Sequence, residues 1–171
     1  MRINLRAALW LLIALVTVGG AWKAVDSRVG EVDSAATKRV TLVIDFGAAS
    51  KLPPVIKVLD GVKQTSAGWS LFKVAGVDAQ GTDEFPSGFV CRLGGWPSEL
   101  QQDCADTPTY AEGHWAYYVT NSKISAGWLL SGQGAAMHVP ECGGYEGWKW
   151  VAAGEETSPP SEQPVVEKCQ P

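Results

Sequence analysis

Histidine is scarce in this sequence, so few side chains offer acid–base chemistry near neutral pH. Only His114 and His138 are present, and neither belongs to a Gly-x-Ser-x-Gly or Cys/His signature. Nucleophilic hydrolysis needs a base held beside the nucleophile and itself oriented by a third group. The sequence predicts no such set, and we expect the protein not to be an enzyme.

Metal chemistry is weakly indicated as well. The carboxylates of Asp78, Asp83 and Glu84 share one turn-rich segment but lack the alternate spacing and closing Glu of a calcium loop. The four cysteines lack CxxC spacing, which disfavours structural zinc. A neutral imidazole is a common metal ligand, so His138 could bind a metal; a packed or hydrogen-bonded histidine is the commoner alternative. We expect no resident metal or cofactor.

Aromatic side chains are the strongest candidates for a function. They are dense between His114 and Trp150, which predicts a packed β core, a recognition surface, or both. Trp96 follows a Gly-Gly pair and Trp128 follows Gly127, so these two indoles are expected to be the most exposed. Core packing is the alternative for all of these rings. The predicted ligand-binding residues are Trp96, Trp115, Tyr117, Trp128, His138 and Trp148.

The first half of the domain shows two hydrophobic periods that would build a sheet and a helix. Residues 40–47 read VTLVIDFG, a β-branched apolar run that predicts a buried strand. Residues 52–65 change to a period near 3.6 after two prolines, which predicts a helix. Residues 69–77 and 89–93 are predicted strands, and the acidic residues 78–88 between them a loop.

The aromatic strands follow a polar loop over residues 98–113. Residues 114–120 alternate, with Trp115, Tyr117 and Val119 on one face. Residues 128–131 and 136–139 are predicted to continue the sheet, and residues 145–151 to close it with Trp148 and Trp150 on one face.

The two ends of the chain differ in composition from this body. Residues 1–21 have a basic start, a short apolar run and small residues, which predicts a secretory signal or an uncleaved membrane anchor. Residues 22–39 have no sustained period and predict a linker before a domain over 40–153. Residues 154–171 are rich in Pro, Ser and Glu and predict a disordered tail.

Four cysteines in an exported chain fit two disulfides, with three pairings possible. Cys91 and Cys104 enclose a loop that can close locally. Cys142 and Cys169 would then tie the tail to the body. The chain is thus expected to be secreted, or held outside the cytoplasm by its N-terminal segment.

Several short motifs recur along the domain: FVCR at 89–92, Cys104, HWAYY at 114–118 and EGW at 146–148. Together they resemble the transcobalamin-like C-terminal domain family, especially its actinobacterial exported relatives. The resemblance implies an α+β fold: a β-grasp-like mixed sheet with one packed helix. It also implies a corrinoid such as cobalamin as a specific candidate ligand, with His138 as a candidate axial ligand to its cobalt.

Three hypotheses for function follow. The first is an exported, non-enzymatic domain that binds a corrinoid or another small ligand at the cell surface. The second is a structural or protein-interaction accessory subunit of a membrane uptake system, with a membrane transport protein as partner. The third is a carbohydrate-binding module. The net charge of −4 disfavours nucleic acid, whose binding rests largely on Lys and Arg.

Overall fold

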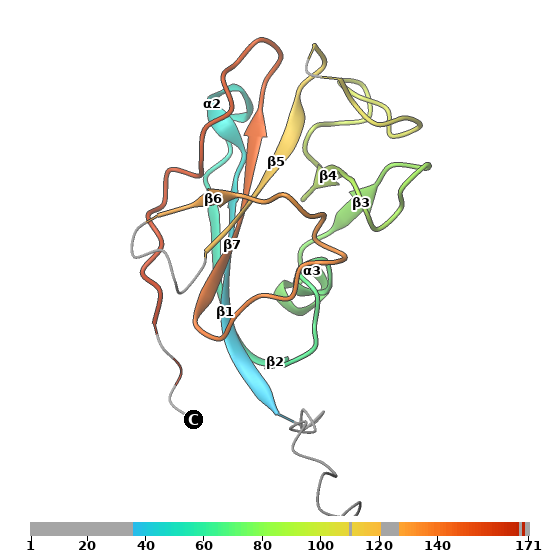
Figure 1. Ribbon diagram of the computed structural model, residues 1–171. Helices are drawn as coiled ribbons and strands as arrows, with labels where there is room; N and C mark the ends of the chain where they lie inside the picture. Colours follow the sequence, from blue (N-terminus) through green and yellow to red (C-terminus); the bar gives the residue numbers. More distant parts are fainter. Residues whose placement is uncertain (1–35, 110, 121–126, 168, 170–171) are drawn as a thin grey trace, which may run out of the picture. The chain divides into compact units, whose positions relative to one another are not determined.

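The computed structural model of the chain describes residues 36–109, 111–120, 127–167 and 169 (Figure 1). The predicted signal or anchor over residues 1–21 and the linker residues 22–35 lie outside this range. Within the described residues, no helix is long and apolar enough to cross a membrane.

A five-stranded sheet forms the body of the domain. Its strands are β1 (Thr37–Asp45), β2 (Val55–Lys63), β5 (His114–Val119), β6 (Leu129–Leu130) and β7 (Gly144–Val151). Their order across the sheet is β2-β1-β7-β5-β6. The central pair β1 and β7 is parallel, whereas the other pairs are antiparallel. The predicted mixed sheet is therefore confirmed, and the fold is mostly β.

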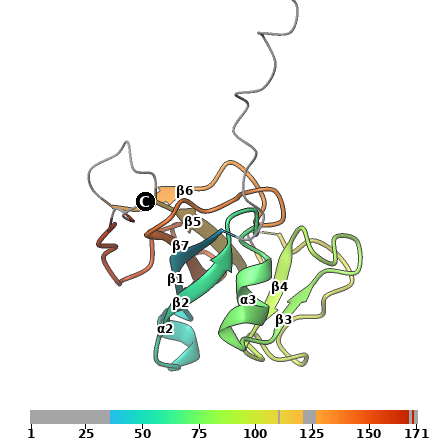
Figure 2. The same cartoon turned by 90° about the horizontal axis from the view of Figure 1, so that it is seen from below.

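Smaller elements pack on one side of this sheet. They are the hairpin of β3 (Ala79–Gly81) with β4 (Val90–Leu93) and the helix α3 (Ser70–Ala75), while the short helix α2 (Gly47–Ser50) follows β1. Figure 2 shows α3 and the hairpin on one side of the sheet and the C-terminal segment on the other.

The main hydrophobic core lies between the sheet and α3 with the hairpin. Alternate residues of the strands face it, as the period of a β-strand requires. Leu71 and Phe72 from α3 are buried in the same core. Its buried side chains on the three central strands are Val40, Leu42, Ile44, Trp115, Tyr117, Val119, Trp148 and Trp150.

The predicted helix over residues 52–65 is wrong, because these residues form β2. The register between β1 and β2 shifts: Val40 pairs with Leu59, but Lys38 pairs with Val62. One extra residue on β2 therefore lies between Leu59 and Val62, and Gly61 adopts a φ of 73° there. The bulge turns both Leu59 and Val62 toward the core at a spacing of three, which imitates a helical period.

Two predicted strands are also wrong. Residues 70–75 of the predicted strand 69–77 form α3, whose neighbouring Leu71 and Phe72 are both buried, as on a helix face. The amides of Met137 and His138 both donate to Gly134 O, which makes 134–138 a turn instead of the predicted strand over 136–139. The short strand β3 lies in the segment predicted to be a loop. The strands predicted at 40–47, 89–93, 114–120, 128–131 and 145–151 are confirmed, with β1 beginning three residues earlier.

Both disulfides are present, Cys91–Cys104 and Cys142–Cys169, as the sequence predicted. Disulfides persist in oxidising compartments, so these two bonds indicate an extracytoplasmic protein.

The C-terminal segment crosses the second face of the sheet without regular secondary structure. Pro160 is fully buried there, and Gly147 lies so close beneath Trp128 and Pro160 that a Cβ would approach the Trp128 ring to 2.6 Å. The Trp128 indole N–H donates to Glu162 O at 2.7 Å. The prediction of a disordered tail is therefore wrong for residues 160–162.

Asp45, at the end of β1, fixes this segment to the sheet. Its Oδ2 accepts from the amide and the hydroxyl of Ser161, both at 2.9 Å, and lies 2.9 Å from Lys149 Nζ. Burial acts to raise the pKa of Asp45, but hydrogen bonds from Lys149, Ser161 and Gly47 hold it at about 2.

We expect Asp45→Asn to remove about 2 kcal/mol from the free energy of unfolding at neutral pH. Because the folded pKa is depressed, this stabilisation is complete above the ordinary Asp pKa and disappears as the pH falls toward about 2. Urea denaturation across this acidic range, with hydrogen exchange of the Ser161 amide, measures both effects. Asp60→Asn is the control, because its ion pair with Arg39 is exposed and is expected to change stability by less than about 1 kcal/mol.

Candidate functional site

A cavity of about 350 Å³ lies over the core face of the aromatic strands. Trp115 and Tyr117 of β5 and Trp148 of β7 line it. Two further segments line the rest: residues 88–90, which lead into β4, and the loop residues 131–135. Three of the six predicted ligand-binding residues thus meet at one cavity.

The register of β5 and β7 positions these three rings. Tyr117 pairs with Trp148, and their rings stack at 4.5 Å with an interplanar angle of 18°. Trp115 pairs with Trp150 and meets both Trp150 and Phe46 edge-on. Such ring pairs add roughly 0.5–1.5 kcal/mol each beyond the area that they bury. The aromatic side of the cavity is therefore rigid.

The glycine-rich segment 131–135 is attached to the sheet and to α3 by its backbone. The Ser131 amide donates to Tyr117 O at 2.8 Å, and Ala135 O accepts from the Trp69 amide at 3.0 Å. A Cβ at Gly134 would lie 3.2 Å from Gly88 O, whereas one at Gly132 would meet no atom within 4 Å. The two loop segments therefore approach each other closely at Gly134.

One polar atom of this cavity's aromatic lining lacks a partner. Trp115 is only 5% exposed, and its indole Nε1 has no hydrogen-bond acceptor among the described residues. Buried donors are nearly always satisfied in folded proteins, because leaving one unpaired costs about 1–3 kcal/mol. The nitrogen is enclosed by its neighbours, so its missing hydrogen bond is a cost of packing Trp115 into the core.

A buried acid lies behind Tyr117. Glu146 of β7 is 1% exposed, and its carboxylate accepts from the Tyr117 hydroxyl and lies 3.2 Å from His138 Nε2. A Cβ at Gly68 would lie 2.6 Å from Glu146 Oε2, so only glycine fits against this carboxylate.

Burial sets the protonation of this group of residues. It raises the pKa of Glu146 against the hydrogen bonds from His138 and Tyr117, and it raises the pKa of the Tyr117 phenol, which stays neutral. The hydrogen bond to Glu146 raises the pKa of His138. Both shifts mean that the Glu146–His138 pair keeps its proton to a higher pH than either group would alone.

Lys38 carries a second buried charge near this acid. Its Nζ donates to Gln64 O at 2.8 Å and to Pro140 O at 2.6 Å. Burial lowers the pKa of Lys38, and the charge of Glu146 acts in the opposite direction. Lys38 thus holds β1 to the segments on both sides of it.

The remaining predicted ligand residues lie elsewhere. Trp96 is partly exposed and packs edge-on against Trp150. Trp128 packs on the opposite face of the sheet under the tail. His138 does not line the cavity; its Nε2 is bound to Glu146. In the described part of the chain, no group of three or more His, Cys, Asp or Glu residues could hold a metal ion.

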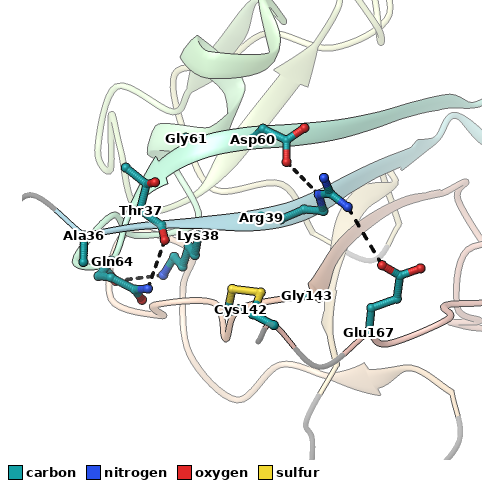
Figure 3. Close-up of a pocket in the computed structure, with 11 residues that line it drawn as sticks. Ala36, Thr37, Lys38, Arg39, Asp60, Gly61, Gln64, Cys142, Gly143 and Glu167 are labelled. Carbon is teal, nitrogen blue, oxygen red and sulfur yellow. Dashed lines mark hydrogen bonds and ion pairs between the residues drawn. A yellow bond between two sulfur atoms is a disulfide. The ribbon is translucent and has the colours of Figure 1, made fainter. Parts of the chain in front are cut away.

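A larger pocket of about 840 Å³ lies beside the start of β1 (Figure 3). Arg39 Nε lies 2.6 Å from Asp60 Oδ1, and its Nη1 lies 4.0 Å from Glu167 Oε2. The Cys142–Cys169 bond lines the same pocket (Figure 3). Arg39, Asp60 and Glu167 are paired with one another and Lys38 Nζ donates to two backbone carbonyls, so this pocket offers a ligand less than the aromatic cavity does.

Sequence reasoning missed Glu146, Gly68, Lys38 and the segment 131–135. A signal for Glu146 was present, because strand alternation places it on the same face as Trp148 and Trp150. A carboxylate on an apolar face indicates a buried, paired acid. No comparable signal marked the segment 131–135, since its place depends on contacts with β5 and α3.

Comparisons of the chain with protein-family models, with curated proteins and with solved structures each found no match.

Proposed function

We propose that this chain is an exported, non-enzymatic domain that binds a small molecule in the cavity over Trp115, Tyr117 and Trp148. The observation that carries the proposal is a cavity with a rigid aromatic side, formed by Trp115, Tyr117 and Trp148. Small-molecule sites are commonly apolar, aromatic and largely pre-formed, with few polar groups.

The absence of catalysis is part of the proposal. His138 is committed to Glu146, and Tyr117 is held neutral by burial, so neither group is poised as a base at the cavity. The chemistry of the site favours holding a ligand over transforming it.

Because of the resemblance to the transcobalamin-like family, the proposal includes a β-grasp-like fold and a corrinoid as the specific candidate ligand. A mixed sheet with α3 packed on one face supports that view of the fold. A cavity of about 350 Å³ is near the lower end of ligand sites, roughly 300–1,000 Å³. It would admit one edge or side group of a corrinoid and leave the macrocycle outside.

The structure supports the interaction module better than the carbohydrate-binding module. An interaction module is favoured by β2, an edge strand with Ile56 and Val58 exposed, because sheet edges readily pair with partners. A carbohydrate platform is less favoured, because Trp96 and Trp128 each pack edge-on against another ring.

The test is a ligand screen by nuclear magnetic resonance, which resolves tryptophan indole N–H signals. A fragment library, cyanocobalamin and cellohexaose would each be titrated into the protein. We expect ligands to shift the Trp115 and Trp148 signals and to leave Trp96 unchanged. If no compound shifts Trp115 or Trp148, the proposed function is wrong and the interaction module takes its place.

A matched pair of glycine variants adds a prediction for any fragment that binds. Gly134→Val is expected to weaken binding at least tenfold, because its side chain would lie between the two loop segments. Gly132→Val, in the same segment, is expected to weaken binding less than Gly134→Val, because its Cβ meets no atom within 4 Å. Equal binding by the two variants would place the ligand outside this cavity. Urea denaturation checks that both remain folded.

A further inference from the structure

The strand β2 forms one border of the sheet and has a free side (Figure 2). Among the described strands, β1 is its only neighbour. A free strand edge presents N–H and C=O groups to which another extended chain can bind. The opposite border is β6, which has only two residues, so β2 is the longer edge.

The register of β1 shows which backbone groups of β2 point outward. The Arg39 carbonyl accepts from the amide just before β7 at 2.8 Å, so the odd-numbered residues of β1 direct their backbone groups toward β7. The even-numbered residues therefore face β2, where Leu42 pairs with Lys57. The backbone groups of Lys57 are thus used inside the sheet. Those of Ile56 and Val58, on either side of it, point away from β1 and are free to bind a partner.

This free edge is short and open to solvent. Pro54 has no N–H group at one end, and the bulge at Gly61 interrupts the strand at the other. Between them, Ile56 is 45% exposed and Val58 is 59% exposed, and Lys57 is exposed as well. Strand alternation places Ile56 and Val58 on one face and Lys57 on the other. A chain lying along this edge would therefore meet an apolar, a basic and an apolar position in turn.

Positive charge is concentrated around this edge, in a chain whose net charge is −4. Residues 46–77 contain one acid, Asp60, whose Oδ1 lies 2.6 Å from Arg39 Nε. The same residues contain four lysines, all exposed, and no ion pair of the described residues engages them. These are Lys51, Lys57, Lys63 and Lys73, the last on α3, which packs against β2. An acidic segment would be attracted to this edge, whereas a second copy of the chain would bring the same lysines and be repelled.

We propose that the edge of β2 binds an extended acidic segment of a partner protein, which adds a strand to the sheet. The residue of the segment opposite Lys57 is acidic, and its two neighbours, opposite Ile56 and Val58, are apolar. This edge does not line the aromatic cavity, so the inference holds whether or not the cavity binds a small molecule.

The first test adds peptides to the wild-type chain. Short acetylated peptides of alternating glutamate and valine, or of alternating lysine and valine, would be titrated while nuclear magnetic resonance follows the backbone amide signals. We expect the acidic peptide to shift the Ile56 and Val58 amides and to bind at least tenfold more tightly than the basic peptide at low salt. The Trp148 indole signal, from the aromatic cavity, should stay unchanged. No shift at Ile56 and Val58 overturns the inference, and equal binding of the two peptides overturns the acidic partner.

Val58→Pro tests the pairing of the two backbones. Proline removes the outward N–H group at this position without removing a hydrogen bond to β1, so we expect binding of the acidic peptide to weaken at least tenfold. Val58→Thr is the matched control, because it keeps the N–H group and a β-branched side chain, and it should bind within about twofold of the wild type. Equal binding by the two variants overturns strand addition.

A modified peptide repeats this test on the unaltered protein. Methylation of all its backbone nitrogens removes the donors of the acidic peptide while keeping its charge, and we expect binding to be lost. If the methylated peptide binds as well as the unmodified one, strand addition is overturned.

Lys57→Glu tests the position of the acid. We expect it to reduce the preference for the acidic over the basic peptide at least fivefold, because it places a like charge opposite the glutamate. An unchanged preference overturns the assignment of the acidic residue to the position opposite Lys57. Analytical ultracentrifugation of the wild type tests the choice of partner: a dimer that Val58→Pro dissociates would make a second copy the occupant of the edge, and a monomer supports a separate partner.

Discussion

Replacing Glu146 with glutamine is expected to lower the free energy of unfolding by about 3 kcal/mol at about pH 6. Glu146 is fully buried, and its carboxylate is the shared partner of Tyr117 and His138. Glutamine has the same shape but cannot balance the charge of a protonated His138, so a partly buried charge would be left uncompensated. Urea denaturation followed by tryptophan fluorescence measures the change.

The pH dependence separates this ion pair from simple packing. Since the folded pKa of His138 is raised, its stabilisation is complete below the ordinary His pKa and disappears as the pH rises through the folded value. The raised pKa of Glu146 acts with the same sign. The charges of Lys38 and Glu141 also act on the pKa of His138, and both residues stay in place in a His138→Asn variant. We expect that variant to lose the part of the decline above about pH 6.5 that comes from His138, while the contribution of Glu146 stays.

A double-mutant cycle gives the matched control. Glu146→Gln and His138→Asn combined should cost less than the sum of the single changes, because both remove one interaction. Additive costs would mean that the Glu146–His138 contact contributes nothing to stability, and the ion pair would then not explain the pH dependence.

The aromatic half of the fold could be predicted because local pattern and tertiary structure agree there. Alternation in β5 and β7 placed Trp115, Tyr117, Trp148 and Trp150 on the core face, where they lie. The edge strand β2 could not be predicted from its period, because the bulge at Gly61 restores Val62 to the core at a helical spacing. Its β-branched residues were the better signal.

The candidate site was only half visible in the sequence, for a related reason. Its aromatic side is built by two regular strands, whereas the segment 131–135 takes its position from backbone contacts with Tyr117 and Trp69, which are distant in the sequence. Trp128 illustrates the limit: a glycine before it suggested exposure, yet its indole packs under a tail more than thirty residues further along the chain. Composition alone predicted that tail to be disordered. The contacts that hold the tail on the sheet are few, so they leave little trace in its composition.

The two disulfides are expected to contribute unequally, in the reverse order of their loop lengths. Chain entropy alone gives about 3 kcal/mol for the separation of 13 residues and about 3.5 kcal/mol for 27. Removing Cys91–Cys104 by Cys91→Ala/Cys104→Ala is expected to cost at least the full 3 kcal/mol or so. Both of its cysteines are buried, and the loop that they close supplies acceptors to the buried Arg92.

Removing Cys142–Cys169 by Cys142→Ala/Cys169→Ala should cost only about 1 kcal/mol. Cys169 is exposed, and the tail is already held upstream at Pro160 and Ser161. Residues beyond those anchors would regain freedom in the native state as well as in the unfolded state, so most of the entropic difference cancels. Urea denaturation of the two double variants measures the order. If Cys142→Ala/Cys169→Ala is the more damaging, loop length governs, and the anchors at Pro160 and Ser161 do not hold the tail without its disulfide.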